Sequence, residues 1–260
     1  MKNWVKEKLA RGEKVTGTFF MTGNVRMMEG LGCADLDYVI IDTEHGPFTT
    51  ETVMGLAMAA ESRHMAPFVR IADVTHRDIQ QAVDAGAYGL IVPCLRTMEE
   101  MRRLVKLAKF PPEGCRGYAQ GRHCGFGAQD WAKDLDEFIR VSNEELLVLP
   151  QCETLECLEQ IEEVAALEGI DGIFVGPFDL SISLGIPGRF TDSRFEAAID
   201  RILAACKAAG KPALIFTSDA AGAKKYLDRG FDGVATSTDI GIFMSGCQAL
   251  ARELRAAAQG

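Results

Sequence analysis

One pattern, repeated along the whole chain, constrains the fold most strongly. Short apolar runs rich in Val, Ile and Phe are each followed by a polar turn and then by a segment whose apolar residues recur with helical spacing. This pattern is typical of βα units that form a parallel sheet. The eight runs are Val15–Met21, Tyr38–Ile41, Ala66–Val69, Gly89–Val92, Leu146–Leu149, Gly172–Val175, Pro212–Phe216 and Gly233–Thr236.

The regularity of these units favours a closed barrel. A Gly-apolar-x-Gly tetrapeptide begins at Gly86, Gly169 and Gly230, which suits a helix that ends on a left-handed glycine just before the next strand. No G-x-G-x-x-G motif follows the first run, which argues against a dinucleotide-binding sheet. Barrels of about 250 residues form one domain. We therefore predict an α/β fold, a single (β/α)8 TIM barrel, over residues 1–260.

Charge and hydropathy exclude several classes of partner. The chain has 28 Lys and Arg residues against 37 Asp and Glu residues, a net charge of −9, so it offers no positive surface for nucleic acid or an anionic membrane. It has neither a long apolar stretch nor the start of a signal peptide. We expect a cytoplasmic protein. The cysteines lack Cys-x-x-Cys spacing and are interpreted as reduced thiols, with Cys94 and Cys152 nearest to strand ends.

Polar residues follow several of the predicted strands. The active site of a (β/α)8 barrel is built at the carboxyl ends of its strands. The second strand is followed by Asp-Thr-Glu-His-Gly at 42–46, the third by Arg70, the fifth by Gln-Cys-Glu-Thr at 151–154 and the sixth by Gly-Pro-Phe-Asp-Leu at 176–180. Acid, base, cation and amide groups therefore face one mouth. No lysine lies at any strand end, so an aldolase of the Schiff-base type lacks its amine.

Two carboxylates at neighbouring strand ends predict a metal site. Glu153 and Asp179 follow the fifth and sixth strands, and adjacent strands lie about 4.8 Å apart. Hard divalent cations such as Mg²⁺ are held by one or two carboxylates together with water and substrate oxygens. The alternative is structural: Glu153 is a solvated charge at the start of the next helix and Asp179 caps another.

His45 and Arg70 are the candidate base and cation. His45 lies three residues after Asp42, a spacing that lets the carboxylate orient the imidazole and raise its pKa. Arg70 ends an apolar strand, where a guanidinium is accommodated if it forks onto a carboxylate. That carboxylate belongs either to a substrate or to the protein itself, in an internal salt bridge. His64, His76 and His123 are assigned to the surface or to loops.

A long irregular segment, residues 110–127, carries Gly and Pro in unusual density. Such segments are usually functional or mobile. We assign it to the connection that begins after the fourth strand and expect it to lie over the barrel mouth. There Arg122 or His123 would contact a distal carboxylate or hydroxyl of a substrate, with a loop salt bridge as the alternative. The role of its part Tyr118–Gly127 is left open.

Five motifs in the same order resemble those of one enzyme family. They are Asp-Thr-Glu-His-Gly-Pro at 42–47, Val-Arg at 69–70, Arg-Gly at 116–117, Gln-Cys-Glu-Thr at 151–154 and Gly-Pro-Phe-Asp-Leu-Ser at 176–181. Together they resemble the metal-dependent (class II) pyruvate aldolases of the phosphoenolpyruvate/pyruvate barrel superfamily. The resemblance implies a catalytic barrel with Glu153 and Asp179 as ligands of Mg²⁺, Mn²⁺ or Co²⁺. It also implies that Gln151 and the main chain near Gly176 and Phe178 contact pyruvate.

The remaining roles implied by the resemblance concern proton transfer and assembly. His45, assisted by Asp42, matches the family's base, and Arg70 matches its arginine on the third strand. Asp84 matches an aspartate that acts near the base across a subunit contact. Members of the family are commonly trimers or hexamers that exchange the last helix between subunits.

The resemblance implies a carbon–carbon lyase. Such an enzyme reversibly cleaves a 4-hydroxy-2-oxo acid to pyruvate and an aldehyde, with the metal stabilising the charge that develops on the pyruvate half. Two alternatives stay open from the sequence. One is another metal-enolate enzyme on the same barrel, an acyl-CoA lyase or a decarboxylase. The other is an oligomeric binding barrel without catalysis.

Overall fold

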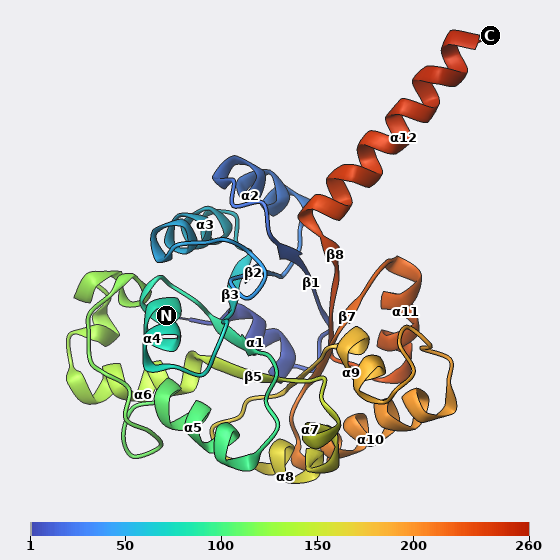
Figure 1. The fold of residues 1–260 in the computed structure, drawn as a ribbon. Coiled ribbons are helices and arrows are strands. Elements are labelled where there is room, and N and C mark those ends of the chain that lie inside the picture. The colour runs from blue at the N-terminus through green and yellow to red at the C-terminus, as the bar shows by residue number, and fades with distance from the viewer. Residues whose placement is uncertain (1, 260) are drawn as a thin grey trace.

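The computed structural model describes residues 2–259 and shows a closed barrel of parallel strands (Figure 1). Each strand pairs with its neighbours in the chain, and β1 closes the barrel by pairing with β8. The predicted (β/α)8 barrel is confirmed. The strands are β1 (Val15–Phe20), β2 (Tyr38–Asp42), β3 (Ala66–Arg70), β4 (Gly89–Val92), β5 (Leu147–Cys152), β6 (Ile173–Val175), β7 (Ala213–Thr217) and β8 (Gly233–Thr238).

Helices surround the barrel, and most begin at a side-chain cap. Thr49, Thr75, Thr97 and Thr154 each accept a backbone N–H of the first helical turn, which satisfies a donor that the helix itself leaves unpaired. The α-helices are α1 (Trp4–Ala10), α2 (Val25–Leu31), α3 (Thr50–Ser62), α4 (His76–Asp84), α5 (Met98–Ala108), α6 (Leu135–Glu145), α7 (Leu155–Glu159), α8 (Ile161–Ala166), α9 (Pro177–Ser183), α10 (Ser193–Ala209), α11 (Ala220–Arg229) and α12 (Asp239–Gln259). The short 3₁₀ helices are η1 (Gly32–Ala34), η2 (Arg122–Gly127) and η3 (Asp130–Ala132).

The core has two layers because side chains alternate across each strand. Val39 and Ile41 of β2 point outward and pack in the larger apolar cluster between strands and helices. Tyr38 and Ile40 of the same strand belong to a second cluster, inside the barrel, where Tyr38 stacks on Phe68 at a ring-centroid distance of 5.0 Å. The apolar runs seen in the sequence are continuous because both faces of each strand are buried.

The predicted glycine turns are confirmed. Gly86, Gly169 and Gly230 have φ angles of +108°, +86° and +118°, values that L side chains rarely adopt. The chain therefore reverses after a helix and enters the next strand within a few residues.

Residues 110–127 do not lie in the connection after β4. That connection is short, because Thr97 caps α5 only five residues after the end of the strand, with a capping box completed by Glu100. The long segment instead follows α5 and packs against α4, outside the mouth (Figure 1). The expectation that it covers the mouth is wrong for the single chain.

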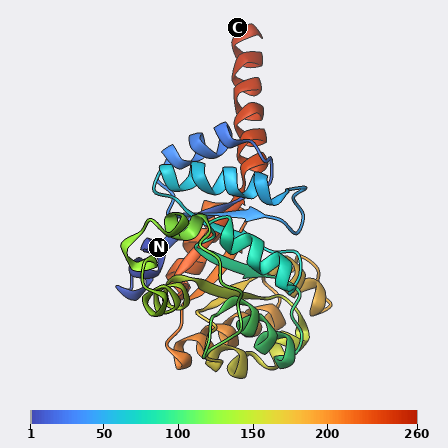
Figure 2. The ribbon, with the colours of Figure 1, turned by 90° about the vertical axis from the view of Figure 1, so that its left-hand side faces the viewer.

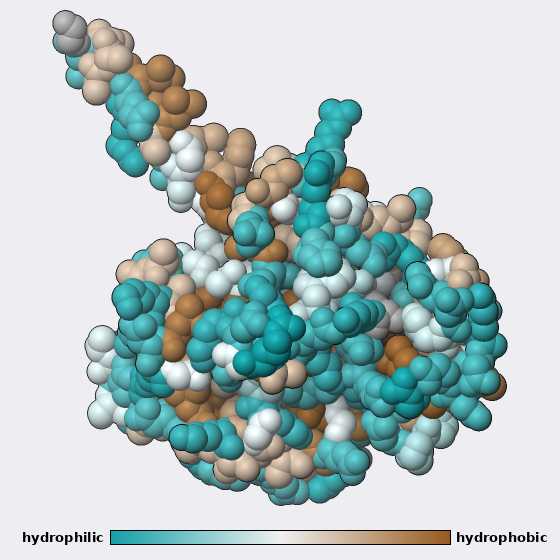
Figure 3. All heavy atoms as spheres, turned by 180° about the vertical axis from the view of Figure 1, so that it is seen from behind, coloured by the Kyte–Doolittle hydropathy of each residue, from teal (hydrophilic) through white to brown (hydrophobic). Residues whose placement is uncertain are grey.

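The last helix, α12, leaves the barrel at the end of β8 and projects from the body in both ribbon views (Figures 1 and 2). Figure 3 shows apolar atoms along it. Its exposed large apolar residues are Ile240, Ile242, Phe243, Met244, Leu250 and Leu254. Within residues 2–259, no helix combines the length and the apolar character that a membrane crossing requires. All eight cysteines are free thiols, as expected.

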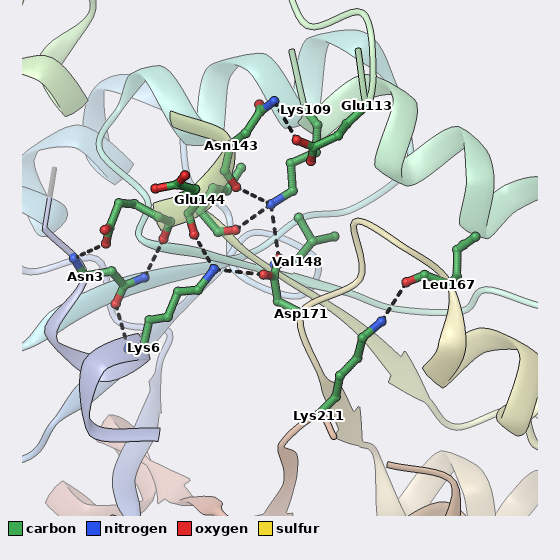
Figure 4. Close-up of polar contacts among 12 residues, drawn as sticks. Asn3, Lys6, Lys109, Glu113, Asn143, Glu144, Val148, Leu167, Asp171 and Lys211 are labelled. Atoms are coloured by element: carbon green, nitrogen blue, oxygen red, sulfur yellow. Dashed lines mark hydrogen bonds and ion pairs between the residues drawn. The ribbon is translucent and has the colours of Figure 1, made fainter. Parts of the chain in front are cut away.

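A buried ammonium group, that of Lys109, joins several segments at the end of the barrel where the strands begin, opposite to the mouth (Figure 4). The Lys109 side chain is 2% exposed, and its Nζ donates to the carbonyl oxygens of Asn143 at 2.7 Å and Leu146 at 2.9 Å and to Asp171 Oδ2 at 3.2 Å. Asp171 also accepts the backbone N–H of Val148 at 3.0 Å. The network therefore joins the end of α5 to the starts of β5 and β6.

We expect Asp171→Ala to lower the free energy of unfolding by about 3 kcal/mol, because it removes the only charged partner of a buried ammonium among the contacts described above. Urea titration followed by circular dichroism measures the change. Asp130→Ala is the matched control, since the Asp130 side chain is 97% exposed in its pair with Lys133, and should change stability by less than about 0.5 kcal/mol. Equal losses in the two variants would contradict the role of the network.

Candidate active site

The candidate site is the layer of inward-pointing side chains at the carboxyl ends of the strands. Along β2 and β3 the alternation that points Ile40 and Phe68 into the barrel also points Asp42 and Arg70 inward, two residues further on. Along β5 the same alternation points Leu149 and then Gln151 into the barrel. The polar residues predicted at the strand ends therefore close the apolar interior at its carboxyl end.

A small cavity lies above this layer. Its volume is about 220 Å³, below the ~300–1,000 Å³ of pockets for drug-sized ligands, which suits a substrate of a few carbon atoms. It brings together seven of the nine residues predicted for the site. Those that line it are Asp42, His45, Arg70, Gln151, Gly176, Phe178 and Asp179.

Glu153 lies just behind the cavity wall and is 4% exposed. Its carboxylate accepts the backbone N–H of Cys94 at 2.7 Å and a hydrogen bond from Gln151 Nε2. No cation pairs with it among the described residues. Burial, together with the charges of Asp179 and Glu44, raises the pKa of Glu153 to about 7. The structural alternative of a solvated charge is therefore wrong, and Thr154 caps the following helix instead.

Gly176 leaves room for two polar side chains of the neighbouring strand end. A Cβ atom on Gly176 would lie 2.5 Å from Gln151 Nε2 and from Glu153 Oε2, so a larger residue here would displace the ends of both side chains. Asp179 falls in the first turn of α9, exposed, and its side chain does not cap that helix. The alternative that Asp179 serves as a cap is wrong.

Arg70 is held by two carboxylates of the protein. Its Nε and Nη2 donate to Asp42 Oδ1 at 2.9 Å and Asp42 Oδ2 at 2.7 Å, and Nη1 lies 3.0 Å from Glu44 Oε2. The carboxylate predicted to accept two hydrogen bonds from Arg70 is thus Asp42 of the protein itself, in an internal salt bridge. The guanidinium still lines the cavity, with its carbon 4.9 Å from the centre of the Phe19 ring.

His45 is placed by Asp42 through the main chain. Asp42 Oδ1 accepts the backbone N–H groups of Glu44 at 3.1 Å and His45 at 3.3 Å, which fixes the turn after β2. The imidazole itself is 65% exposed, and its Nε2 lies 3.9 Å from Glu44 Oε2. The expectation that Asp42 orients the ring directly is corrected: the fork from Arg70 occupies that carboxylate.

Asp84 lies outside the cavity of its own chain. It ends α4, where it accepts from Gln80 Nε2 at 2.8 Å and lies 3.5 Å from Arg116 Nη2 and 3.8 Å from His123 Nδ1. His123 lies in the irregular segment, within η2, so its loop placement holds, but its side chain is buried and the surface placement is wrong. Arg122 pairs with Glu61, so the loop salt bridge predicted as the alternative is the observed arrangement.

Aromatic side chains complete the cavity and were not predicted. Phe19, Phe174 and Phe216 are the inward-pointing residues at the ends of β1, β6 and β7. The same period-two alternation that identifies Asp42 would have identified them. Within residues 2–259 no group of three or more His, Cys, Asp and Glu side chains is arranged to hold a metal ion.

Comparison with known proteins decides the family. Residues 16–245 match the HpcH/HpaI aldolase/citrate lyase family. The chain belongs to this family. The resemblance seen in the motifs is confirmed, and the protein is an enzyme of the aldolase/lyase type.

Relatives in this family align over nearly the whole chain. A protein of Escherichia fergusonii named 5-keto-4-deoxy-D-glucarate aldolase is 34% identical over 250 residues, 96% of this chain and 95% of that one. The structure of an HpcH/HpaI aldolase/citrate lyase family protein from Burkholderia cenocepacia has a TM-score of 0.90 and 31% identity, over 98% of this chain and 100% of that one. An HpcH/HpaI aldolase from Desulfitobacterium hafniense gives a TM-score of 0.89 and 29% identity, over 96% of each chain.

The buried His123 predicts a pH dependence of stability. Burial, with the charge of Arg116, lowers the pKa of its imidazole to about 3 from 6.5. In the unfolded chain His123 therefore takes up a proton near pH 6.5, whereas in the folded chain it does so only near pH 3. The free energy of unfolding consequently falls as the pH drops from about 6.5 toward 3. We expect the wild type to lose about 2 kcal/mol more than His123→Leu between pH 8 and pH 5. Urea titrations at both pH values measure this, and parallel losses would contradict a neutral buried imidazole.

Proposed function

We propose that the protein is a divalent-metal-dependent aldolase that reversibly cleaves a 4-hydroxy-2-oxo acid to pyruvate and an aldehyde. The observation that carries this proposal is Glu153, a buried carboxylate without a cation partner among the described residues, at the mouth it shares with Asp179. A buried carboxylate is costly unless it is paired or coordinates a metal ion.

The donor set suits a hard divalent cation such as Mg²⁺, Mn²⁺ or Co²⁺. Glu153 and Asp179 supply two carboxylates on adjacent strand ends, and water and substrate oxygens supply the other ligands. The amide oxygen of Gln151, buried and without a hydrogen-bond partner, is a further polar atom free to meet a ligand or its water. When bound, the metal stabilises the negative charge that develops on the pyruvate half during cleavage.

Residues of the chain orient the keto acid. Arg70 adds positive charge to the cavity wall, and its pairing with Asp42 holds the guanidinium in one place. Gln151 and the main chain near Gly176 and Phe178 border the same space. The pyruvate half therefore lies between Arg70 and the end of β5.

His45 acts as the general base. Its exposed imidazole takes the proton of the C4 hydroxyl, the C3–C4 bond breaks, C4 leaves as the aldehyde carbon, and C3 of the pyruvate unit takes up a proton. Acid–base catalysis of this kind contributes about 10²–10⁴-fold. Run in reverse, the same groups add pyruvate to an aldehyde.

Metal dependence is the first test. A chelator should abolish pyruvate release from a 4-hydroxy-2-oxo acid, and added Mn²⁺ or Mg²⁺ should restore it. Glu153→Gln should lower kcat by about 10²-fold or more and weaken Mn²⁺ binding, because it removes one of two charged ligands. Pyruvate is measured by a coupled dehydrogenase and Mn²⁺ binding by calorimetry.

A matched variant controls for an effect of charge alone. Glu156→Gln changes an exposed glutamate three residues away that pairs with Arg96, and should leave both measurements unchanged. Full activity in chelator would contradict the metal role. Acetyl-CoA or carbon dioxide as the product in place of pyruvate would favour the acyl-CoA lyase or the decarboxylase.

We further propose that the protein is a homo-oligomer, a trimer or hexamer, in which α12 packs on another copy. The exposed apolar side chains of the projecting helix support this, because isolated apolar patches of this kind mark protein contacts. Such an assembly would also let Asp84 approach the His45 of another copy. The remaining partners are the small oxo-acid and aldehyde substrates.

A chain that ends at residue 241 tests the assembly. Removing the rest of α12 should convert the oligomer to a smaller species in light scattering coupled to gel filtration. Phe243→Glu, which keeps the helix, should weaken association in the same direction because it places a charge among the apolar contacts. If both variants keep the molecular mass of the wild-type assembly, the proposed packing of α12 on another copy is contradicted.

A further inference from the structure

The backbone of Cys94 is held in a conformation that residues with a side chain rarely adopt. Its φ angle is +61°, in the left-handed region. Asp35 and His64 have similar angles, +59° and +62°, but each lies at the end of a helix, where a left-handed residue is common. Cys94 instead follows the strand β4. Such conformations persist where the surrounding contacts impose them, and they cluster at functional sites.

The main-chain N–H of Cys94 points at the buried carboxylate of the site. It donates to Glu153 Oε1 at 2.7 Å, a short hydrogen bond to an acidic acceptor. The other oxygen, Glu153 Oε2, accepts from Gln151 Nε2. Each oxygen therefore has one donor, which fixes the plane of the carboxylate as well as its position. Each oxygen also keeps a lone pair for a further ligand.

Contacts with the segment after β5 hold the turn that follows β4. Leu95 is buried in the larger apolar cluster, and its carbonyl oxygen accepts from Thr154 Oγ1 at 2.9 Å. The carbonyl oxygen of Arg96 accepts from Gln160 Nε2 at 3.0 Å. The turn is thus tied to the same strand end that carries the buried carboxylate, and its N–H is held in one direction.

The side chain of Cys94 contributes little to this arrangement. Cys94 is exposed, and its Sγ lies 3.9 Å from Glu44 Oε1, a long separation even for sulfur. The hydrogen bond to Glu153 belongs to the main chain. It is therefore available to any residue that keeps the same φ angle at this position.

We infer that Cys94 is a positioning residue for the metal site: its left-handed backbone aims an N–H at Glu153 and thereby raises the affinity for the divalent cation. The inference rests on the proposed function, which makes Glu153 a metal ligand. Groups that hydrogen-bond to a metal ligand orient it, and removing one typically costs about 10–100-fold in metal affinity or activity. Here that group is a backbone amide.

An ester at position 94 tests the N–H directly. The α-hydroxy acid that corresponds to alanine, incorporated into the full chain by nonsense suppression, replaces the N–H by an oxygen atom. Cys94→Ala is the matched control because it keeps the amide. We expect the dissociation constant of Mn²⁺, measured by calorimetry, to be at least about tenfold higher for the ester than for Cys94→Ala. Equal affinities would overturn the inference.

Two further substitutions separate the backbone from the thiol. Cys94→Gly keeps the left-handed conformation without strain and should bind Mn²⁺ as tightly as the wild type. Cys94→Val places a β-branched residue where it is a genuine outlier, and should bind Mn²⁺ about tenfold or more weakly because the N–H turns away from Glu153. Weak binding by Cys94→Gly would overturn the inference, since the thiol would then carry the effect.

Asp35 provides the control for backbone strain alone. Asp35→Val introduces the same side chain at a similar φ angle, at an exposed position after η1. It should lower the free energy of unfolding in urea, as Cys94→Val does, but leave the affinity for Mn²⁺ unchanged. If Cys94→Val loses stability and still binds Mn²⁺ like the wild type, the conformation is only structural and the inference is overturned.

The outcomes distinguish the inference from the proposed function. A wild type that binds no Mn²⁺ would overturn the metal site of the proposed function. A wild type that binds Mn²⁺, with an affinity that no change at position 94 weakens, would overturn only the inference. If Cys94→Val fails to fold by circular dichroism, the ester and Cys94→Gly still decide the question.

Discussion

Folding places one unfavourable group, the carboxylate of Glu153, out of water at the end of β5, and the site is built around it. Two hydrogen-bond donors hold it, yet its pKa rises to about 7 because burial and the neighbouring charges of Asp179 and Glu44 disfavour the anion. A fold tolerates such a group where a ligand compensates for it, and perturbed carboxylates in clefts are candidates for function on this physical ground.

The closed parallel barrel determines what surrounds this carboxylate. Parallel strands all end at the same mouth, and the inward residue at each end becomes part of one layer. Where that residue is Asp42, Arg70 or Gln151, the layer is polar. Where it is Phe19 or Phe216, the layer is apolar. In the proposed function, the keto acid is bound by the polar part of this layer.

Much of this could be predicted from the sequence, for physical reasons. The barrel follows from eight apolar runs whose spacing leaves room for at least one helix between successive strands, and the polar half of the site follows from the strand ends. Local spacing did not reveal that Asp42 contacts His45 only through its backbone, because the fork from Arg70, 28 residues away in the chain, occupies its oxygens. The segment 110–127 was misplaced because its composition marks a loop without saying which helix precedes it.

The metal site is tested most directly by locating the ion. A crystal soaked with MnCl₂ and pyruvate should give an anomalous scattering peak between the β5 and β6 ends, about 2.0–2.3 Å from one oxygen each of Glu153 and Asp179. Pyruvate density should lie beside the same peak, toward Arg70. A well-ordered crystal with no peak there, or with Mn²⁺ bound only elsewhere, would contradict the central claim.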